Sequence, residues 1–221
     1  MLRHPSVPYI LPFSVFLGFL AAAPHSGISS RALLVVWPAV VAISIWVFSR
    51  EVLSFRCVAP GWSILVGVGV CVVWVAPDLV FPGWRQHWLF QNALTGGVKT
   101  SLAPEVYSDA LALWLRSLRA VLIVPIVEEL FWRGWLMRWI INPKFDEVKL
   151  GAYTAASFWG VAVLFALEHG PYWEVGFLAG AIYNGWMVRT RSLGDLILAH
   201  AVTNACLCLF VVLTGRWEYW L

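Results

Sequence analysis

Residues 61–80 read GWSILVGVGVCVVWVAPDLV and include a single charged residue, Asp78. About 20 residues are what an α-helix needs to cross the hydrocarbon core of a bilayer. In lipid the backbone must satisfy its own hydrogen bonds, so an apolar run of this length becomes a helix. The stretch therefore predicts a transmembrane helix, which Pro60 precedes and Pro82 follows.

The composition of the whole chain agrees with this prediction. Hydrophobic residues make up 61% of the 221 residues, charged residues only 12%, and the mean hydropathy is +0.78. A soluble domain is nearer half apolar and a quarter charged, and a disordered chain needs high charge, so both classes are excluded. Fifteen tryptophans suit membrane interfaces, and a net charge of +3 gives no basic footprint for nucleic acid. The four cysteines have no CxxC spacing and are read as apolar fillers.

Six further apolar runs lie on either side of residues 61–80. They cover residues 9–23, 32–48, 110–141, 151–169 and 174–188, with a last run that follows residues 192–195 and ends at 213. Residues 81–107 are broken by proline and glycine and predict an interfacial loop or half-helix. We expect an all-α polytopic membrane protein of about seven transmembrane helices, with a single transmembrane domain over 1–221 and a motif-bearing core at 109–213.

The distribution of lysines and arginines predicts which end of the bundle faces the cytoplasm. With the N-terminus inside, the segments between helices carry eight Lys or Arg on the inner side and six on the outer side, which favours a cytoplasmic N-terminus. Residues 9–23 could also be a signal peptide, but Pro24 directly after three alanines is a poor residue to follow a cleavage site. We therefore expect this helix to be retained.

Charged residues inside apolar runs are costly in a bilayer and are the first functional candidates. Glu128 and Glu129 follow the apolar residues 121–127. Glu129 and Arg133 are four residues apart, so they share a helix face and can form an ion pair. Glu128 is rotated by about 100° from Glu129 and is less well placed to use Arg133, which leaves it freer for chemistry.

Two later helices carry polar residues at the same spacing. Phe165 and His169 are four residues apart, as are His200 and Asn204. If both helices start on the inner side, His169 and His200 differ in depth by roughly 16 Å, so convergence needs a tilted or projecting helix. Other charges are read as structural. Glu168 is expected to be a solvated or interfacial carboxylate at a helix end, and Arg116 and Arg119 are expected to extend towards lipid headgroups.

These helices could gather two carboxylates, two imidazoles and an amide around one buried pocket. Such a pocket could activate a water molecule and stabilise an oxyanion, and amide hydrolysis requires both. Glutamate and histidine are also zinc ligands, so Glu128, His169 and His200 could instead hold a divalent metal that binds the water. A proton relay in a transporter would use the same residue types, but no repeat relates the two halves of this short chain. A scaffold whose polar residues only join helices stays open.

Three motifs in this order resemble the CPBP family of intramembrane proteases, which includes the CAAX prenyl endopeptidases and bacterial relatives. EELFWR at 128–133 is similar to the family's EExxxR motif, FALEH at 165–169 to FxxxH, and HAVTN at 200–204 to HxxxN. Order and approximate spacing agree, and the resemblance covers about residues 109–213. The first three helices add only hydropathy.

The resemblance implies a glutamate-dependent or metal-dependent membrane endopeptidase. Its candidate catalytic residues are Glu128, Glu129, His169, His200 and Asn204, with Arg133 and Phe165 supporting. Glu128 with His169 would activate water, and His200 with Asn204 would stabilise the oxyanion. The implied substrate is a membrane-associated protein or peptide, in a bacterial inner membrane, with no nucleic-acid partner. Some relatives act in bacteriocin immunity, so a non-catalytic membrane protein is the alternative.

Overall fold

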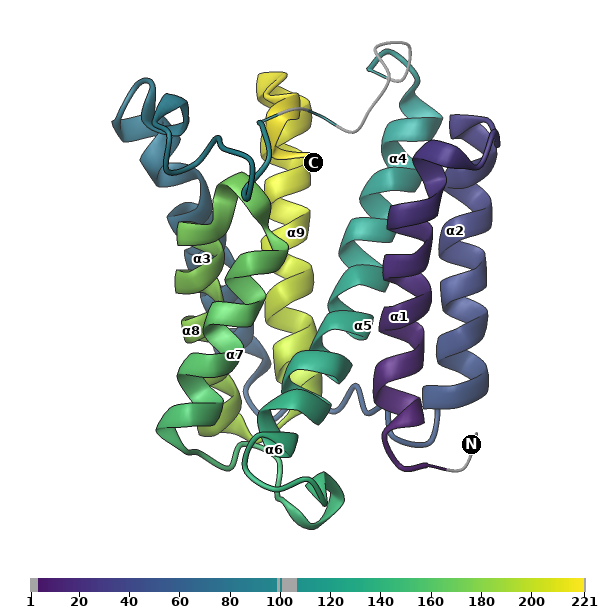
Figure 1. Cartoon of the computed structure of the whole chain (residues 1–221), viewed down its shortest axis with the longest axis vertical. Helices are drawn as coiled ribbons and strands as arrows, with labels where there is room; N and C mark the ends of the chain where they lie inside the picture. The colour runs from purple at the N-terminus through teal and green to yellow at the C-terminus, as the bar shows by residue number, and fades with distance from the viewer. Residues whose placement is uncertain (1–3, 99, 101–106, 221) are drawn as a thin grey trace.

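The computed structural model describes residues 4–98, 100 and 107–220. Within these residues every regular element is a helix, apart from one isolated β-bridge between Asn92 and Gly96. Seven helical segments run alternately up and down, so the two ends of the chain lie at opposite ends of the bundle (Figure 1). The prediction of an all-α polytopic membrane protein is confirmed.

The helical segments follow one another with short connections. They are α1 (Val7–Ala22), α2 (Ser30–Ser44) with the π-helical η2 (Ile45–Ser49), α3 (Pro60–Val80), a composite helix of α4 (Ala110–Leu118), α5 (Val124–Glu129) and α6 (Met137–Trp139), then α7 (Ala155–Glu168), α8 (Trp173–Thr190) and α9 (Leu193–Thr214). Four stretches are long and apolar enough to cross a membrane: Ser30–Ser49, Pro60–Val80, Ala110–Trp139 and Leu193–Thr214. The helices α1 and α7 are apolar but shorter.

The outward faces of these helices are apolar. More than half of the surface of each of the side chains Leu65, Val72, Leu122, Leu167 and Leu209 is exposed. Apolar surface of this extent is unfavourable in water and is the normal lining of a protein that faces lipid. The bundle is therefore built to be solvated by the membrane.

Close helix pairs depend on two glycines. Helix α3 packs along α9, and α7 packs along α8. A Cβ atom on Gly67 would lie 2.4 Å from the Ala199 carbonyl oxygen, and one on Gly180 would lie 3.2 Å from the Ala162 Cα atom. Small residues let backbones approach in this way, as is usual where helices associate in membranes.

The chain just before α3 is held by a residue from another helix. Asp195, a buried residue in the first turn of α9, accepts hydrogen bonds from the backbone nitrogens of Val58 (2.6 Å) and Ala59 (2.9 Å). The Ser63 hydroxyl donates to the same carboxylate at 2.7 Å. Since Val58 and Ala59 directly precede Pro60, the first residue of α3, the carboxylate fixes the start of α3 against α9.

The composite helix contains two π-helical turns, η5 (Arg119–Ile123) and η6 (Leu130–Leu136). In η5 the Val124 N–H bonds to the Arg119 carbonyl, and the next residue, Pro125, has no N–H to give to the Ala120 carbonyl. The Asn204 side chain of α9 donates that hydrogen bond instead, at 2.8 Å. Proline therefore does not end the helix, because a neighbouring helix satisfies the freed carbonyl.

The segment that links α3 to α4 is a loop rather than a half-helix in its described part. Residues 81–98 contain one 3-10 turn, η3 (Trp84–Gln86). Residues 99 and 101–106 of the predicted interfacial segment lie outside the described residues. The loop covers the end of the bundle at which α7 meets α8 (Figure 1).

Candidate active site

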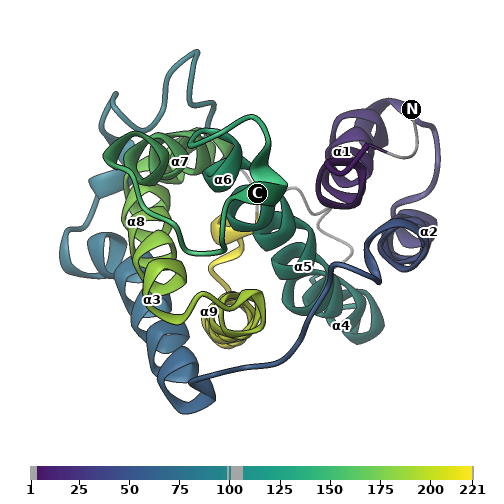
Figure 2. The same cartoon turned by 90° about the horizontal axis from the view of Figure 1, so that it is seen from below.

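A cavity of about 300 Å³ lies within the bundle. It is bounded by α9 on one side and by α4, η5 and α5 on the other, with α1, α2, α3, α7 and α8 completing the wall. Figure 2 shows α9 between α3 on one side and α4 and α5 on the other, with α1 and α2 outside them. Glu128, Glu168, His169, His200 and Asn204 are among the residues that line it.

Glu128 presents its carboxylate to this cavity. Only 5% of the residue is exposed, and its side chain makes no hydrogen bond to any described residue. The Oε2 atom is buried without a partner in that part of the chain. A buried carboxylate that lacks a partner costs free energy, and natural proteins keep such groups mainly where they react or bind.

Glu129 faces away from the cavity into a closed ion-pair network. Its Oε1 atom is 3.2 Å from Arg133 Nη1 and 2.8 Å from His200 Nδ1. Arg133 also donates to the Asn184 side-chain oxygen at 2.9 Å and to the Gly180 carbonyl at 3.2 Å. The predicted pair is therefore present, and it joins the composite helix to α8 and α9.

His200 is held on both sides. Nδ1 faces the Glu129 carboxylate, so this nitrogen carries a proton and Nε2 is left for other partners. The ring stacks on Tyr183 with centroids 5.2 Å apart, and the Tyr183 hydroxyl donates to Thr203 Oγ1 at 2.7 Å. These contacts fix the direction of Nε2.

His169 ends α7 and is oriented by its own helix. Nδ1 lies 2.7 Å from the Phe165 carbonyl oxygen, which can only accept, so Nδ1 carries the proton and the neutral ring accepts through Nε2. The Phe165 ring is 4.6 Å from the His169 ring, 6.4 Å from the His200 ring and 4.6 Å from the Arg133 guanidinium carbon. Phe165, the first residue of the second motif, therefore lies beside residues of the first and third motifs.

Three charged residues are placed differently from the sequence prediction. Glu168 ends α7, as predicted, but its carboxylate lines the cavity and accepts a hydrogen bond from Trp132 Nε1 at 3.2 Å. Arg116 and Arg119 also line the cavity instead of extending to headgroups. The composite helix turns these two positions inward, an orientation that apolar periodicity around two π-helical turns does not reveal.

Two residues that support the site, Asn184 and Tyr183, were not predicted from the sequence. Asn184 binds Arg133 and donates to the Phe158 carbonyl at 2.7 Å, which ties α8 to α7. Tyr183 packs against His200. Asn184 is an amide within a largely apolar stretch of sequence. This signal alone could have indicated a buried polar partner such as Arg133.

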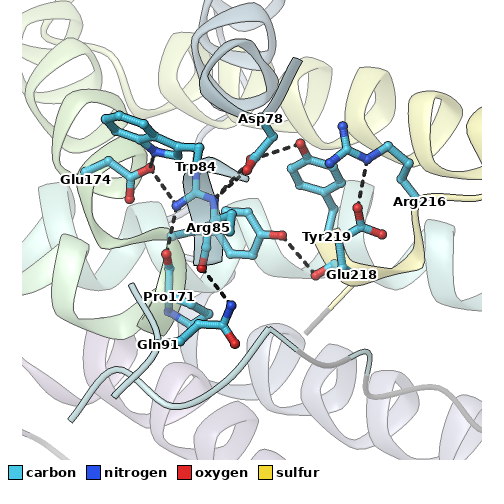
Figure 3. Close-up of polar contacts among 10 residues, drawn as sticks. Asp78, Trp84, Arg85, Gln91, Pro171, Glu174, Arg216, Glu218 and Tyr219 are labelled. Carbon is cyan, nitrogen blue, oxygen red and sulfur yellow. Dashed lines mark hydrogen bonds and ion pairs between the residues drawn. The ribbon is translucent and has the colours of Figure 1, made fainter. Parts of the chain in front are cut away.

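An ion-pair network lies next to the cavity, because it includes Tyr219, one of the residues that line the cavity (Figure 3). Arg85 binds Asp78 through Nε at 3.0 Å and Glu174 through Nη1 at 2.6 Å, and it donates to the Pro171 carbonyl at 2.8 Å. The Tyr219 hydroxyl donates to Asp78 Oδ2 at 3.0 Å. Burial disfavours the guanidinium charge, but Glu174 and Asp78 outweigh this effect and raise the pKa of Arg85. The network joins the interfacial loop, α3, α8 and the C-terminal turn.

The expected metal ligands do not form a metal-binding group. In the ranges that the structure describes, no three His, Cys, Asp or Glu side chains are placed to hold a metal ion. Among the three candidates, Glu128 is unpaired, whereas His169 and His200 each use Nδ1 within the protein. All three residues line the same cavity of about 300 Å³.

Together the fold and the cavity define a class, the polytopic helical membrane proteins that bury acidic and imidazole groups at the centre of the bundle. Comparison with known families narrows this class. Residues 110–206 match the family described as type II CAAX prenyl endopeptidase Rce1-like. The match confirms the resemblance that the three motifs indicated, over somewhat less than half of the chain. No curated protein and no solved structure is significantly similar to the chain.

The family match supports protease activity at the level of the family. All the candidate catalytic residues lie within the matched range, including His200 and Asn204 near its end. Helices α1, α2 and α3 lie outside the match, although Phe16, Trp37 and Trp74 from them line the same cavity.

Proposed function

We propose that the protein is an intramembrane endopeptidase that hydrolyses a peptide bond of a membrane-associated protein or peptide. The observation that carries the proposal is the Glu128 carboxylate, which faces the cavity without a hydrogen-bond partner among the described residues. A carboxylate left in this state is available to accept a proton from water. The family match supplies independent support for proteolysis.

The proposed chemistry begins with a water held between Glu128 and His169. Glu128 accepts the proton of the water as the oxygen attacks the carbonyl carbon of the substrate. Nε2 of His169 accepts the water's second hydrogen bond, because Nδ1 is committed to the Phe165 carbonyl. Glu128 then returns the proton to the leaving amine, so the proton balance closes within the site.

The oxyanion of the tetrahedral intermediate would be stabilised from α9. His200 would donate from Nε2, which requires the cationic form of the ring because the Nδ1 proton already faces the Glu129 carboxylate. Asn204 has two amide hydrogens and gives one to the Ala120 carbonyl, which leaves one for the substrate. Preorganised donors of this kind commonly supply the largest part of the rate enhancement.

Glu129, Arg133 and Asn184 are proposed to position these groups. The network is completely buried and binds three helices together. A non-catalytic scaffold or immunity-type protein would use such a network in the same way. Only the unpaired Glu128 distinguishes the two proposals, because a scaffold gains nothing from leaving a buried carboxylate without a partner.

The experiment compares wild-type protein with Glu128→Gln and Glu129→Gln in the same lipid nanodiscs. A library of fluorescence-quenched peptides with an N-terminal acyl chain serves as substrate. Hydrolysis by wild-type protein that Glu128→Gln abolishes supports the proposal. Equal hydrolysis by the wild-type and Glu128→Gln proteins would contradict it, and so would a protein that is fully active in its biological assay with Gln at position 128.

We further propose that the bundle end with the loops 50–59, 140–154 and 190–192 faces the cytoplasm of a bacterial inner membrane. These loops lie together, because a Cβ atom on Gly151 would be 2.8 Å from Arg191 Cγ and one on Gly194 would be 2.5 Å from the Arg56 carbonyl oxygen. The positive-inside rule supports this orientation, since the loops carry Arg50, Arg56, Lys144, Lys149 and Arg191.

A further inference from the structure

Glu168 is a second carboxylate on the wall of the cavity that contains Glu128. It ends α7, whereas Glu128 is on α5, so two different helices bring the two carboxylates to one cavity. Oε2 of Glu168 accepts a hydrogen bond from Trp132 Nε1 at 3.2 Å. The other oxygen, Oε1, forms no hydrogen bond with any described residue. The protein therefore fixes one oxygen of Glu168 and leaves the other for a ligand or a water.

The indole that holds Glu168 belongs to the same composite helix as Glu128. Trp132 follows Glu128 by four positions, which places the two residues about one turn apart. The Trp132 ring also packs against Phe165 of α7, with ring centroids 5.9 Å apart. These contacts hold the end of α7 beside the turn that carries Glu128. The two carboxylates are close enough to interact electrostatically.

Two carboxylates in one buried cavity are most stable when they share a proton, because two negative charges in an apolar surrounding repel each other. The bond from Trp132 fits a protonated Glu168, since one oxygen of a carboxylic acid can accept while the other carries the proton. Oε1 of Glu168 can then present an O–H group to the cavity while Glu128 is ionised and ready to accept a proton from water.

We propose that Glu168 is a further catalytic residue, through which the proton taken from the attacking water is returned to the leaving amine. The proposal rests on the proposed function. Glu128 takes the proton of the water as the new C–O bond forms. The C–N bond then breaks and its electron pair stays on nitrogen. Oε1 of Glu168 gives its proton to that nitrogen and receives the Glu128 proton in exchange. Both residues are then back in their starting states, and no other proton donor is needed.

The leaving group decides whether this proton is required. An amine leaves a tetrahedral intermediate only after its nitrogen is protonated. A thiol has a pKa of about 8.5 and leaves as the thiolate without a proton. Both reactions need the water that Glu128 activates. Glu168→Gln should therefore slow hydrolysis of an amide much more than hydrolysis of a thioester, whereas Glu128→Gln should slow both.

The probe is the acylated, fluorescence-quenched peptide of the library that wild-type protein cleaves fastest, with its scissile bond located by mass spectrometry. A second probe has the same sequence with a thioester in place of that amide. We expect Glu168→Gln to lower kcat for the amide by about 10²–10⁴-fold and kcat for the thioester by less than tenfold. Glu168→Asp keeps a carboxylic acid and should restore part of the amide rate. The ratio of the two rates does not depend on the fraction of protein that is folded.

The matched control is Glu174→Gln. Glu174 also accepts from an indole, Trp84 Nε1, at 3.2 Å, but it is not among the residues that line the cavity. Its substitution should leave the ratio of amide to thioester rates unchanged, whatever it does to stability.

The proposal is overturned if Glu168→Gln slows both probes by the same factor, as a purely structural residue would, or if it slows neither. In both cases wild-type protein still cleaves the peptide, so the proposed function stands without the relay. A wild-type protein that hydrolyses no peptide of the library would instead reject the proposed function, and the relay with it.

Discussion

The Glu129 carboxylate and the His200 imidazole meet at 2.8 Å between Oε1 and Nδ1, although the two residues are 71 positions apart in the chain. The same oxygen binds Arg133. This contact links the first and last of the three motifs through a residue that does not line the cavity. The two adjacent glutamates therefore differ in environment. Glu129 is paired within the protein, whereas Glu128 lines the cavity without a hydrogen-bond partner among the described residues.

Glu128→Gln should abolish peptide hydrolysis, with a loss of at least about 10²–10⁴-fold, because glutamine cannot accept the proton of the water. Folding should change little, since glutamine keeps the size of the side chain and the site already lacks a hydrogen-bond partner. Turnover of a quenched peptide and the thermal unfolding midpoint are measured on the same preparation. Retained activity in Glu128→Gln protein together with a stable, inactive Glu129→Gln protein would show that the two roles are reversed.

Glu129→Gln should reduce the stability of the protein. Arg133 is fully buried, and removing its anionic partner leaves an uncompensated charge, which typically costs about 3–5 kcal/mol. Chemical unfolding in a fixed detergent gives the free energy of unfolding. Glu147→Gln is the control, because Glu147 forms an exposed pair with Lys144 that should contribute almost nothing. Similar stability of both variants would contradict the structural role of Glu129.

Asn204→Leu should destabilise the composite helix by about 1–3 kcal/mol, because the Ala120 carbonyl is left without a donor. The same substitution should cost less in a Pro125→Ala background, where residue 125 regains an N–H that can serve this carbonyl. A double-mutant cycle on the free energy of unfolding measures this coupling. Additive effects would mean that Asn204 does not compensate for the proline.

Gly67→Ala should destabilise the α3–α9 pair by about 1–3 kcal/mol, the usual cost of overpacking. Its Cβ atom would lie 2.4 Å from a backbone oxygen, which cannot move as a side-chain end can. Gly69→Ala is the matched control two residues away, where a Cβ atom meets nothing within 4 Å. Equal unfolding midpoints for the two variants would contradict the close approach of the helices.

Cysteine labelling in a background without native cysteines tests the orientation. Lys144→Cys, in the loop before α7, should react with an impermeant maleimide only after the membrane is opened. Leu94→Cys, which replaces a residue that is 97% exposed in the interfacial loop, should react from outside in intact cells. The reverse pattern would place the N-terminus outside.

Much of the fold could be predicted from the sequence because bilayer thickness fixes the length of an apolar run and helix geometry fixes the i,i+4 spacing. The seven segments and the Glu129–Arg133 pair both follow from such local rules. Local rules also separated Glu128 from Glu129, since neighbouring positions on a helix point in different directions.

The convergence of the motifs was decided by tertiary structure. Helix α7 begins at Ala155, four residues later than predicted, which removes about 6 Å of the expected depth difference between His169 and His200. Arg116 and Arg119 of the composite helix line the cavity, and Asn204 supplies the hydrogen bond to the Ala120 carbonyl that Pro125 cannot give. Sequence periodicity assumes one helical repeat, so it determines which residues share a face of one helix. Which faces meet depends on contacts between helices far apart in the chain.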